Sequence, residues 1–148
     1  MNTHVLGDTE IQEEATVRFE QGIPGFERFK SWVILLEEEN PVFAHLQSVE
    51  ESEIGFLLAN PFSFYPDYQF QLPAPFQEEL RLENENDVEV WTIVTVGKKI
   101  EDCTLNLAAP VIVNKKLKLG KQLILQNTSY QTKHFLIQYS ADLTRPKE

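Results

Sequence analysis

The segment Gln21-Gly22-Ile23-Pro24-Gly25-Phe26-Glu27 combines two glycines with a proline and separates two strand-like runs. Glycine adopts positive φ angles without a steric penalty, and proline fixes its own φ near −65°. A Pro-Gly pair suits the second and third positions of a tight turn, so this segment predicts a rigid turn around Pro24 and Gly25. We expect the turn to join two strands and to carry no chemistry of its own.

Two strand-like runs flank this turn. Before it, Val17 and Phe19 alternate with polar neighbours, which predicts that a first strand over about residues 10–20 is half-buried. After it, residues 32–37 begin with a continuous apolar run and predict a second, fully buried strand. The turn and its two strands therefore form the start of a β-sheet.

The remainder of the chain is also strand-like. Further strands are predicted at residues 42–48, 54–59, 88–96, 111–113 and 123–125, and residues 135–139 are expected to close the sheet. A short helix is predicted at residues 75–80, because a proline suits the first turn of a helix and acidic residues follow it. Irregular structure is predicted for residues 60–75. Strands joined by short loops, with one or two short helices, are typical of a mostly β, antiparallel barrel-like domain or a sandwich.

Length and composition indicate one cytoplasmic domain. The chain has 148 residues, of which 42% are hydrophobic, enough to bury a core. We expect a single β domain over residues 1–141 and a frayed tail over residues 142–148. No apolar run approaches the roughly 20 residues of a membrane span, and the N-terminus lacks the features of a signal peptide. The single cysteine, Cys103, excludes an internal disulfide and suits a reducing compartment.

The net charge of −10 is unevenly distributed. Residues 1–60 carry 12 acidic and 3 basic side chains, residues 61–114 carry 9 and 3, and residues 115–148 carry 2 and 7. This acidic body argues against direct nucleic-acid binding, which needs Lys and Arg to neutralise phosphates. It suits a basic protein partner, and the alternative is that the acidic surface only maintains solubility.

Candidate catalytic and metal-binding residues are few. The chain has neither a glycine-rich phosphate loop nor a His-Glu-x-x-His pair, and its three histidines stand alone in the sequence. His45 is expected to be a core or surface histidine rather than a metal ligand. Cys103 follows two acidic residues, which disfavour the thiolate, so it is expected to be a poor nucleophile. We therefore predict no cofactor and no metal, although the fold could still bring carboxylates together.

Several short motifs occur together along the chain. They are residues 22–26 (GIPGF), 46–48 (LQS), 66–68 (PDY), 87–88 (DV), 93–95 (IVT), 106–114 (NLAAPVIVN) and 120–122 (GKQ), followed by Tyr130. Pro110 requires a strand start or an edge position, and Asn106 and Asn114 are predicted to bond local backbone at strand ends. With these motifs the chain resembles the FliW family of flagellar assembly factors over roughly residues 10–137. One departure is Gly97, near which the resemblance leads us to expect a proline.

The resemblance implies a non-enzymatic regulator with two protein partners. Members of the family bind cytoplasmic flagellin through its C-terminal region, in the manner of a chaperone. When flagellin is exported, they bind and antagonise the carbon storage regulator CsrA, an RNA-binding repressor of flagellin translation. The alternative left open by the residues themselves is a small β-barrel enzyme or ligand-binding domain that uses a carboxylate cluster.

Two groups of residues are the predicted contacts for these partners. For the basic surface of CsrA we predict acidic residues in loops, namely Glu50, Glu51, Glu53, Glu83, Glu85 and Asp87. Residues 61–70 hold five aromatic residues in ten, more than a short strand can point inward, and two prolines keep them out of a central sheet. Some of these rings should be partly exposed, and the predicted flagellin contacts are Phe62, Phe64, Tyr65 and Tyr68. The alternative is that these rings fill one end of the barrel.

Overall fold

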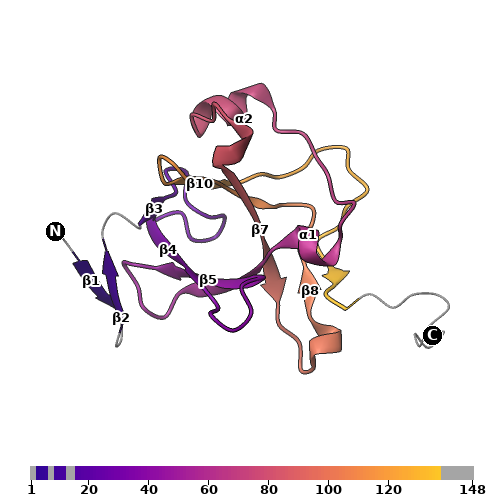
Figure 1. The fold of residues 1–148 in the computed structure, drawn as a ribbon, viewed down its shortest axis with the longest axis horizontal. Helices are drawn as coiled ribbons and strands as arrows, with labels where there is room; N and C mark the ends of the chain where they lie inside the picture. Colours follow the sequence, from indigo (N-terminus) through magenta and orange to yellow (C-terminus); the bar gives the residue numbers. More distant parts are fainter. Residues whose placement is uncertain (1–2, 7–8, 13–15, 138–148) are drawn as a thin grey trace.

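The chain forms a closed β-barrel with two short α-helices (Figure 1). The structure, a computed structural model, describes residues 3–6, 9–12 and 16–137. The barrel strands are β3 (Val17–Arg18), β4 (Ser31–Leu36), β5 (Phe43–Ser48), β6 (Gly55–Ala59), β7 (Val88–Thr95), β9 (Val111–Asn114) and β10 (Leu119–Gln122). They are ordered β7-β6-β5-β4-β3-β10-β9, and the pairing of β9 with β7 closes the ring. The prediction of a mostly β, barrel-like fold is confirmed.

The closure of the barrel differs from the prediction. Strand β7 is eight residues long, so its first half pairs with β9 while its second half pairs with β8 (Thr104–Leu105). Strand β11 (His134–Phe135) pairs with β8 outside the ring. The prediction that residues 135–139 close the sheet is therefore wrong. One pair in the ring, β3 with β10, is parallel, and the other pairs are antiparallel.

The predicted first strand, residues 10–20, is not continuous in the barrel. Strand β2 (Thr9–Gln12) pairs with β1 (Thr3–Leu6) in a separate two-stranded sheet, and only Val17–Arg18 joins the ring. The alternation predicted for this segment is correct, because Val17 and Phe19 are buried while Arg18 and Glu20 are exposed. The predicted tail at residues 142–148 lies outside the described residues.

Two further strand predictions need correction. Residues 123–125 are not a strand, because the Leu123 N–H donates to the Pro110 carbonyl at 2.8 Å but Pro110 has no N–H to donate in return, so the ladder ends there. Strand β4 is not fully buried: Trp32 and Val33 are buried, but Leu36 at its end is 57% exposed. The apolar run therefore extends past the edge of the core.

The core fills the barrel interior and continues outside it beneath the second helix. Phe19, Trp32, Leu46 and Leu58 are buried inside the ring, together with inward-facing residues of β9. Helix α2 (Ala74–Glu79) covers the opposite face of β9, where Ile112 packs with side chains from the helix. Successive residues of a strand point to opposite faces, so β9 is buried on both sides.

The turn predicted at Pro24 and Gly25 is present. Gly22 and Gly25 have φ angles of 74° and 88°, and the Phe26 N–H donates to the Ile23 carbonyl at 2.6 Å. Pro24 and the positive-φ Gly25 thus occupy the central positions of a type II turn. At Gly22, an added Cβ would lie 2.4 Å from the Cα of Glu27, so the turn folds back onto its own start.

The helices are short, and one was not predicted. Helix α1 (Pro61–Phe64) forms within the segment predicted to be irregular, because Asn60 accepts the Phe62 N–H through its side chain at 2.9 Å and Pro61 opens the first turn. The predicted helix at residues 75–80 is confirmed as α2. Single 3-10 turns occur at η2 (Glu85–Asp87) and η3 (Ile100–Asp102). Within the part of the chain that the structure describes, no helix is long and apolar enough to cross a membrane.

Asn114 ties α2 to the turn between β9 and β10. Its side-chain amide donates to the carbonyls of Leu80 and Arg81, and its oxygen accepts the N–H groups of Lys116 and Leu117, all within 3.2 Å. Asn114 is 2% exposed. The prediction that Asn114 bonds backbone at a strand end is confirmed. Its side chain also bonds backbone at the end of α2, which the sequence did not predict.

Candidate functional site

The first predicted acidic group, Glu50, Glu51 and Glu53, lies in the turn between β5 and β6. Ser48 Oγ accepts the N–H groups of Glu50 and Glu51 at 3.1 and 3.0 Å. The side-chain amide of Gln47 lies 3.0–3.4 Å from four carbonyl oxygens of the same turn. These contacts hold the hairpin in one conformation, so its carboxylates are presented from a rigid support.

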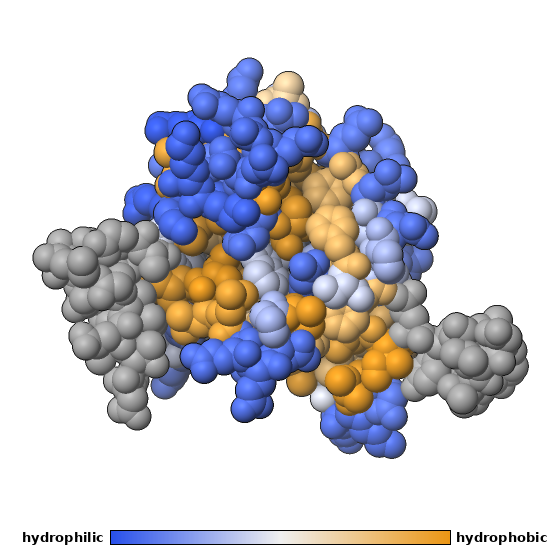
Figure 2. Space-filling model, in the orientation of Figure 1, coloured by the Kyte–Doolittle hydropathy of each residue, from blue (hydrophilic) through white to orange (hydrophobic). Residues whose placement is uncertain are grey.

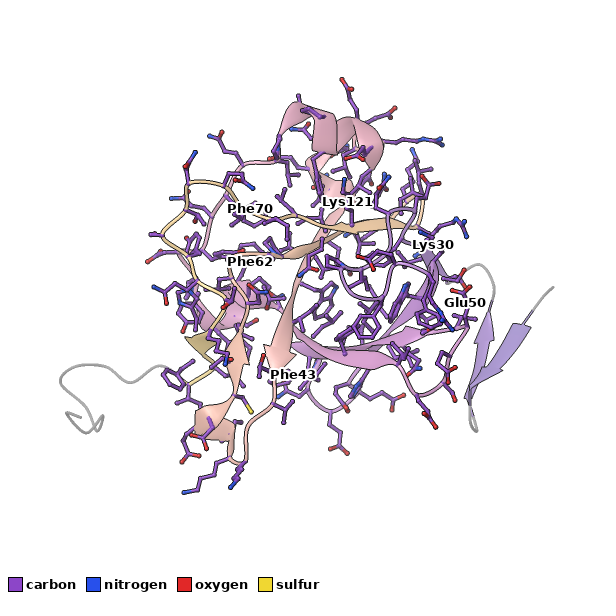
Figure 3. The ribbon with its side chains drawn as sticks, turned by 180° about the vertical axis from the view of Figure 1, so that it is seen from behind. Lys30, Phe43, Glu50, Phe62, Phe70 and Lys121 are labelled. Atoms are coloured by element: carbon purple, nitrogen blue, oxygen red, sulfur yellow. The ribbon has the colours of Figure 1, made fainter. Side chains whose placement is uncertain are left out.

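The carboxylate of Glu50 is engaged by the protein's own backbone. Its Oε1 accepts the N–H groups of Lys30 and Ser31 at 2.7 and 3.1 Å, and Figure 3 shows Glu50 beside Lys30 at the edge of the barrel. This side chain joins the β5–β6 turn to the start of β4. Its role is structural in part, which leaves Glu51 and Glu53 as the acidic side chains of this hairpin best suited to meet a partner.

A groove separates this hairpin from the Pro-Gly turn, and we name it the Phe26 groove. It has a volume of about 620 Å³ and is lined by Gly25, Phe26, Glu27, Arg28, Phe29, Glu51, Glu53 and Ile54. Phe26, Phe29 and Ile54 are half-buried and form its apolar part. The sequence prediction missed the contribution of the turn, because it assigned that segment a purely structural role.

The second predicted acidic group lies elsewhere, between α2 and β7. Glu83 and Glu85 line a separate hollow of about 530 Å³ that also includes Phe70, Leu72 and Val88. Asp87 is half-buried, and its carbonyl accepts the Lys115 N–H at 2.7 Å. Four of the six predicted acidic residues therefore line two separate hollows, Glu50 and Asp87 line neither, and the six do not form one site.

The predicted aromatic residues are exposed to very different extents. Phe62 is 42% exposed, whereas Phe64 and Tyr65 are half-buried. The ring of Phe64 packs against Phe43, with 5.7 Å between centroids, and the Tyr65 hydroxyl donates to the Phe135 carbonyl at 2.5 Å. The expectation that some rings are partly exposed is confirmed, chiefly at Phe62.

Tyr68 belongs to the core and does not present a contact surface, contrary to the prediction. It is 4% exposed, and its hydroxyl donates to the Leu107 carbonyl at 2.8 Å. Burial, with a smaller contribution from Tyr130, raises the pKa of its hydroxyl well above the usual range. Its ring lies 5.8 Å from that of Phe62 and 5.3 Å from that of Phe70. The buried Tyr68 ring therefore supports Phe62, which Figure 3 shows near Phe70.

Hydrophobic side chains reach the surface in several places on the face shown in Figure 2, among them over β4 and β5 and beside β7 and β8. The surface over α2 is hydrophilic in the same view. Among the residues whose burial the structure describes, 16–137, the large hydrophobic side chains that are exposed are Leu36, Phe62, Val96, Ile100, Leu117, Ile124 and Phe135.

His45, His134 and Cys103 have structural surroundings. His45 is exposed on β5, with Nε2 3.0 Å from a Glu37 carboxylate oxygen. His134 Nε2 accepts the Gln131 N–H at 2.8 Å, and burial lowers the pKa of its imidazole. Cys103 is buried, with Sγ 3.4 Å from the Gly97 nitrogen. Across residues 3–6, 9–12 and 16–137, no three or more His, Cys, Asp and Glu residues are placed to hold a metal ion.

The barrel and its motifs match known proteins along nearly the whole chain. Residues 1–136 match the family described as FliW protein. The chain belongs to the FliW family. The flagellar assembly factor FliW of Geobacillus kaustophilus is 48% identical over 134 residues, which cover 90% of this chain and 92% of the relative. That of Clostridium novyi is 44% identical, with 90% and 94% covered.

The fold of this FliW-family chain also matches a solved member. The crystal structure of a flagellar assembly factor FliW superposes with a TM-score of 0.82 at 41% identity, covering 93% of this chain and 98% of the other. The resemblance noted from the sequence motifs is thereby confirmed. As a member of a flagellar assembly factor family, the chain is a flagellar assembly factor by relationship, and the surfaces described above are its candidate contact sites.

Proposed function

We propose that this chain is a non-enzymatic regulator that acts in the cytoplasm by binding flagellin and, once flagellin has been exported, by binding and antagonising CsrA. Membership of the FliW family along the whole barrel carries this proposal. No observation on the described residues favours the alternative of a carboxylate-based enzyme.

The flagellin contact is proposed on the surface formed by Phe62, Phe64 and Tyr65, which we name the α1 surface. An amphipathic helix, the form expected for the C-terminal segment of flagellin, requires an apolar surface while it remains in the cytoplasm. Phe62 supplies an exposed ring that the buried Tyr68 supports. Such a rigid, partly exposed aromatic residue is typical of an energetic hot spot.

A Phe62→Ala variant tests this contact with little risk to the fold, because 42% of the residue is already exposed. We expect purified flagellin to bind at least about tenfold more weakly, in line with the loss of an aromatic hot spot, and the melting temperature to change little. Leu117→Ala is the matched control, since Leu117 is 45% exposed and lies on the β9–β10 turn. Unchanged binding by the Phe62 variant, or an equal loss in the control, would refute the α1 surface.

The CsrA contact is proposed on the acidic side of the molecule. CsrA presents a basic surface, and opposite charges speed encounter and set the register of docking. Of the predicted acidic residues, Glu51 and Glu53 combine a rigid hairpin with a neighbouring groove. Isothermal titration of purified CsrA with this chain, with and without flagellin, tests the two-partner scheme: flagellin should compete with CsrA, and simultaneous full binding of both would contradict it.

A further inference from the structure

The Phe26 groove has a preformed apolar floor. Phe26 packs edge-on against Phe56 with 5.3 Å between centroids, Phe56 lies 5.9 Å from Trp32, and Trp32 lies 6.3 Å from Phe19 in the barrel centre. A continuous row of aromatic rings thus connects the groove to the core. Because cores are close-packed and have low compressibility, the floor is held in place before any ligand arrives.

Both walls of the groove are also fixed by hydrogen bonds. On one side, the Gly25 N–H donates to Glu27 Oε2 at 3.1 Å, in addition to the bond across the type II turn. On the other side, Ser48 holds the β5–β6 turn through the N–H groups of Glu50 and Glu51. A preformed site loses little conformational entropy on binding, which favours affinity for a short segment.

The rim of the groove is negatively charged. Glu27, Glu51 and Glu53 supply three carboxylates, against one guanidinium from Arg28. The Arg28 guanidinium lies 4.8 Å from the centroid of the neighbouring Phe29 ring, so it is stacked on the wall of the groove. The rim therefore attracts cations and repels acidic segments.

We propose that the Phe26 groove is the docking site for a basic segment of a partner protein in which one apolar side chain is flanked by lysine or arginine. The apolar side chain would lie on Phe26 and Ile54, and the flanking cations would pair with Glu51 and Glu53. Lys and Arg suit this position because their stems cover apolar surface while their charged ends reach a carboxylate. The inference rests on the proposed function in that it names the groove through which a basic partner is held.

A peptide titration tests the chemistry of the groove directly. The probe is the peptide acetyl-KKFKK-amide, added to the ¹⁵N-labelled full chain, with acetyl-EEFEE-amide and acetyl-KKGKK-amide as controls. We expect amide shifts concentrated at residues 25–29 and 51–54, strongest for the first peptide and absent for the acidic one. Shifts concentrated at residues 83–88, the other acidic hollow, or equal shifts with the glycine peptide, would overturn the proposal.

Charge variants distinguish peptide binding in the groove from a general effect of the chain's negative net charge. The pair Glu51→Lys and Glu53→Lys should weaken binding of the basic peptide at least about tenfold, whereas Arg28→Gln should strengthen it about two- to fivefold. The matched control is Glu38→Lys with Glu39→Lys, which makes the same change of charge at exposed positions between β4 and β5. If the control pair weakens binding as much, net charge and not the groove is responsible, and the proposal fails.

The same variants distinguish this inference from the proposed function. Failure of the unmodified chain to bind CsrA, together with groove-centred peptide shifts, would refute the proposed partner and leave the groove intact. Binding of CsrA that the Glu51 and Glu53 pair does not weaken would refute the groove as its docking site.

A second copy of the chain is the competing occupant, because its exposed turn at residues 115–118 has the sequence Lys-Lys-Leu-Lys. Sedimentation equilibrium of the full chain at low salt measures this directly. Self-association that the Glu51 and Glu53 pair abolishes would assign the groove to a second copy and overturn the partner proposal. A monomer over the whole concentration range supports a separate partner.

Discussion

Gly22 and Gly25 provide a matched pair in which the same substitution should have different costs. Both residues have positive φ, so alanine at either position adds roughly 1–2 kcal/mol of backbone strain to the folded state. Alanine also lowers the conformational entropy of the unfolded chain, which offsets about 0.4–1 kcal/mol of that strain. At Gly25 an added Cβ has no atom within 4 Å, whereas at Gly22 it would lie 2.4 Å from the Glu27 Cα and 2.7 Å from the Glu27 carbonyl oxygen. The backbone of the turn must therefore move in the Gly22 variant.

These terms set the expected magnitudes. Gly25→Ala should lower the free energy of unfolding by about 0.5–1 kcal/mol, and the β-branched Gly25→Val by about 1 kcal/mol or more. Gly22→Ala should lower it by about 2–4 kcal/mol, because displacing packed backbone adds about 1–3 kcal/mol. For a chain of this size the melting temperature falls by roughly 2–4 °C for each kcal/mol, so the two alanine variants should be clearly separated.

Urea unfolding followed by tryptophan fluorescence measures the difference, because Trp32 and Trp91 are 0% and 5% exposed in the barrel. Gly25→Asn is the control, since asparagine adopts the left-handed conformation more readily than alanine, and it should be less destabilised than Gly25→Ala. Equal destabilisation of the two alanine variants, or the reverse order, would refute the reasoning from close approach at Gly22.

Three further predictions concern other parts of the molecule. Asn114→Ala should lower the free energy of unfolding by about 2–4 kcal/mol in urea unfolding, because it leaves buried carbonyl and N–H groups without partners. Asn106→Ala, which removes the hydrogen bond that Asn106 Oδ1 accepts from the Ala108 N–H, should lower it by only about 1 kcal/mol. Because burial lowers the pKa of His134 below its ordinary 6.5, the neutral imidazole contributes stability above pH 6.5 that is lost as the pH falls through the lower folded pKa. The protection of the Gln131 amide against hydrogen exchange, measured relative to the intrinsic rate at the same pH, should then fall in acid, and an unchanged protection factor would contradict this. Association with CsrA should slow as salt rises, because screening weakens steering, and stopped-flow rates independent of salt would exclude an acidic docking face.

Local patterns predicted much of the fold. The alternation around Val17 and Phe19, the β-branched run of β7 and the Pro-Gly turn each express geometry within a few residues, and all were correct. The closing pair of β7 with β9 was missed, because the partner of a strand is chosen by tertiary packing. Strand β10 was missed because Leu119–Gln122 contains no β-branched or aromatic residue, and the prediction instead placed a strand at the apolar residues 123–125 that follow.

The candidate contact residues were predicted by type but not by environment. Four of the six acidic residues lie in loops as predicted, whereas Glu85 and Asp87 belong to the 3-10 turn η2. The backbone partners of Glu50 come from residues 30 and 31, and that proximity is visible only in the folded chain. Nothing in the sequence distinguished Tyr68 from the aromatic residues beside it. In the fold its hydroxyl donates to the Leu107 carbonyl and its ring is buried. One available signal was overlooked: charged Glu27 and Arg28 stand between Phe26 and Phe29, a pattern typical of rings that are only half-buried.

The parallel pairing of β3 with β10 has a consequence for synthesis of the protein on the ribosome. Arg18 meets Leu119 in the finished sheet, and its N–H donates to the Lys118 carbonyl. Strands β3 to β6 are adjacent in sequence and can assemble early, but they form an open meander until the segment around residue 119 has been translated. During that interval the free edge of β3 is available for pairing with another nascent chain. Ring closure is therefore a late event that joins residues far apart in the sequence, and such events are intrinsically slow. Pairing between nascent chains is expected first in cells that translate this messenger RNA at high density.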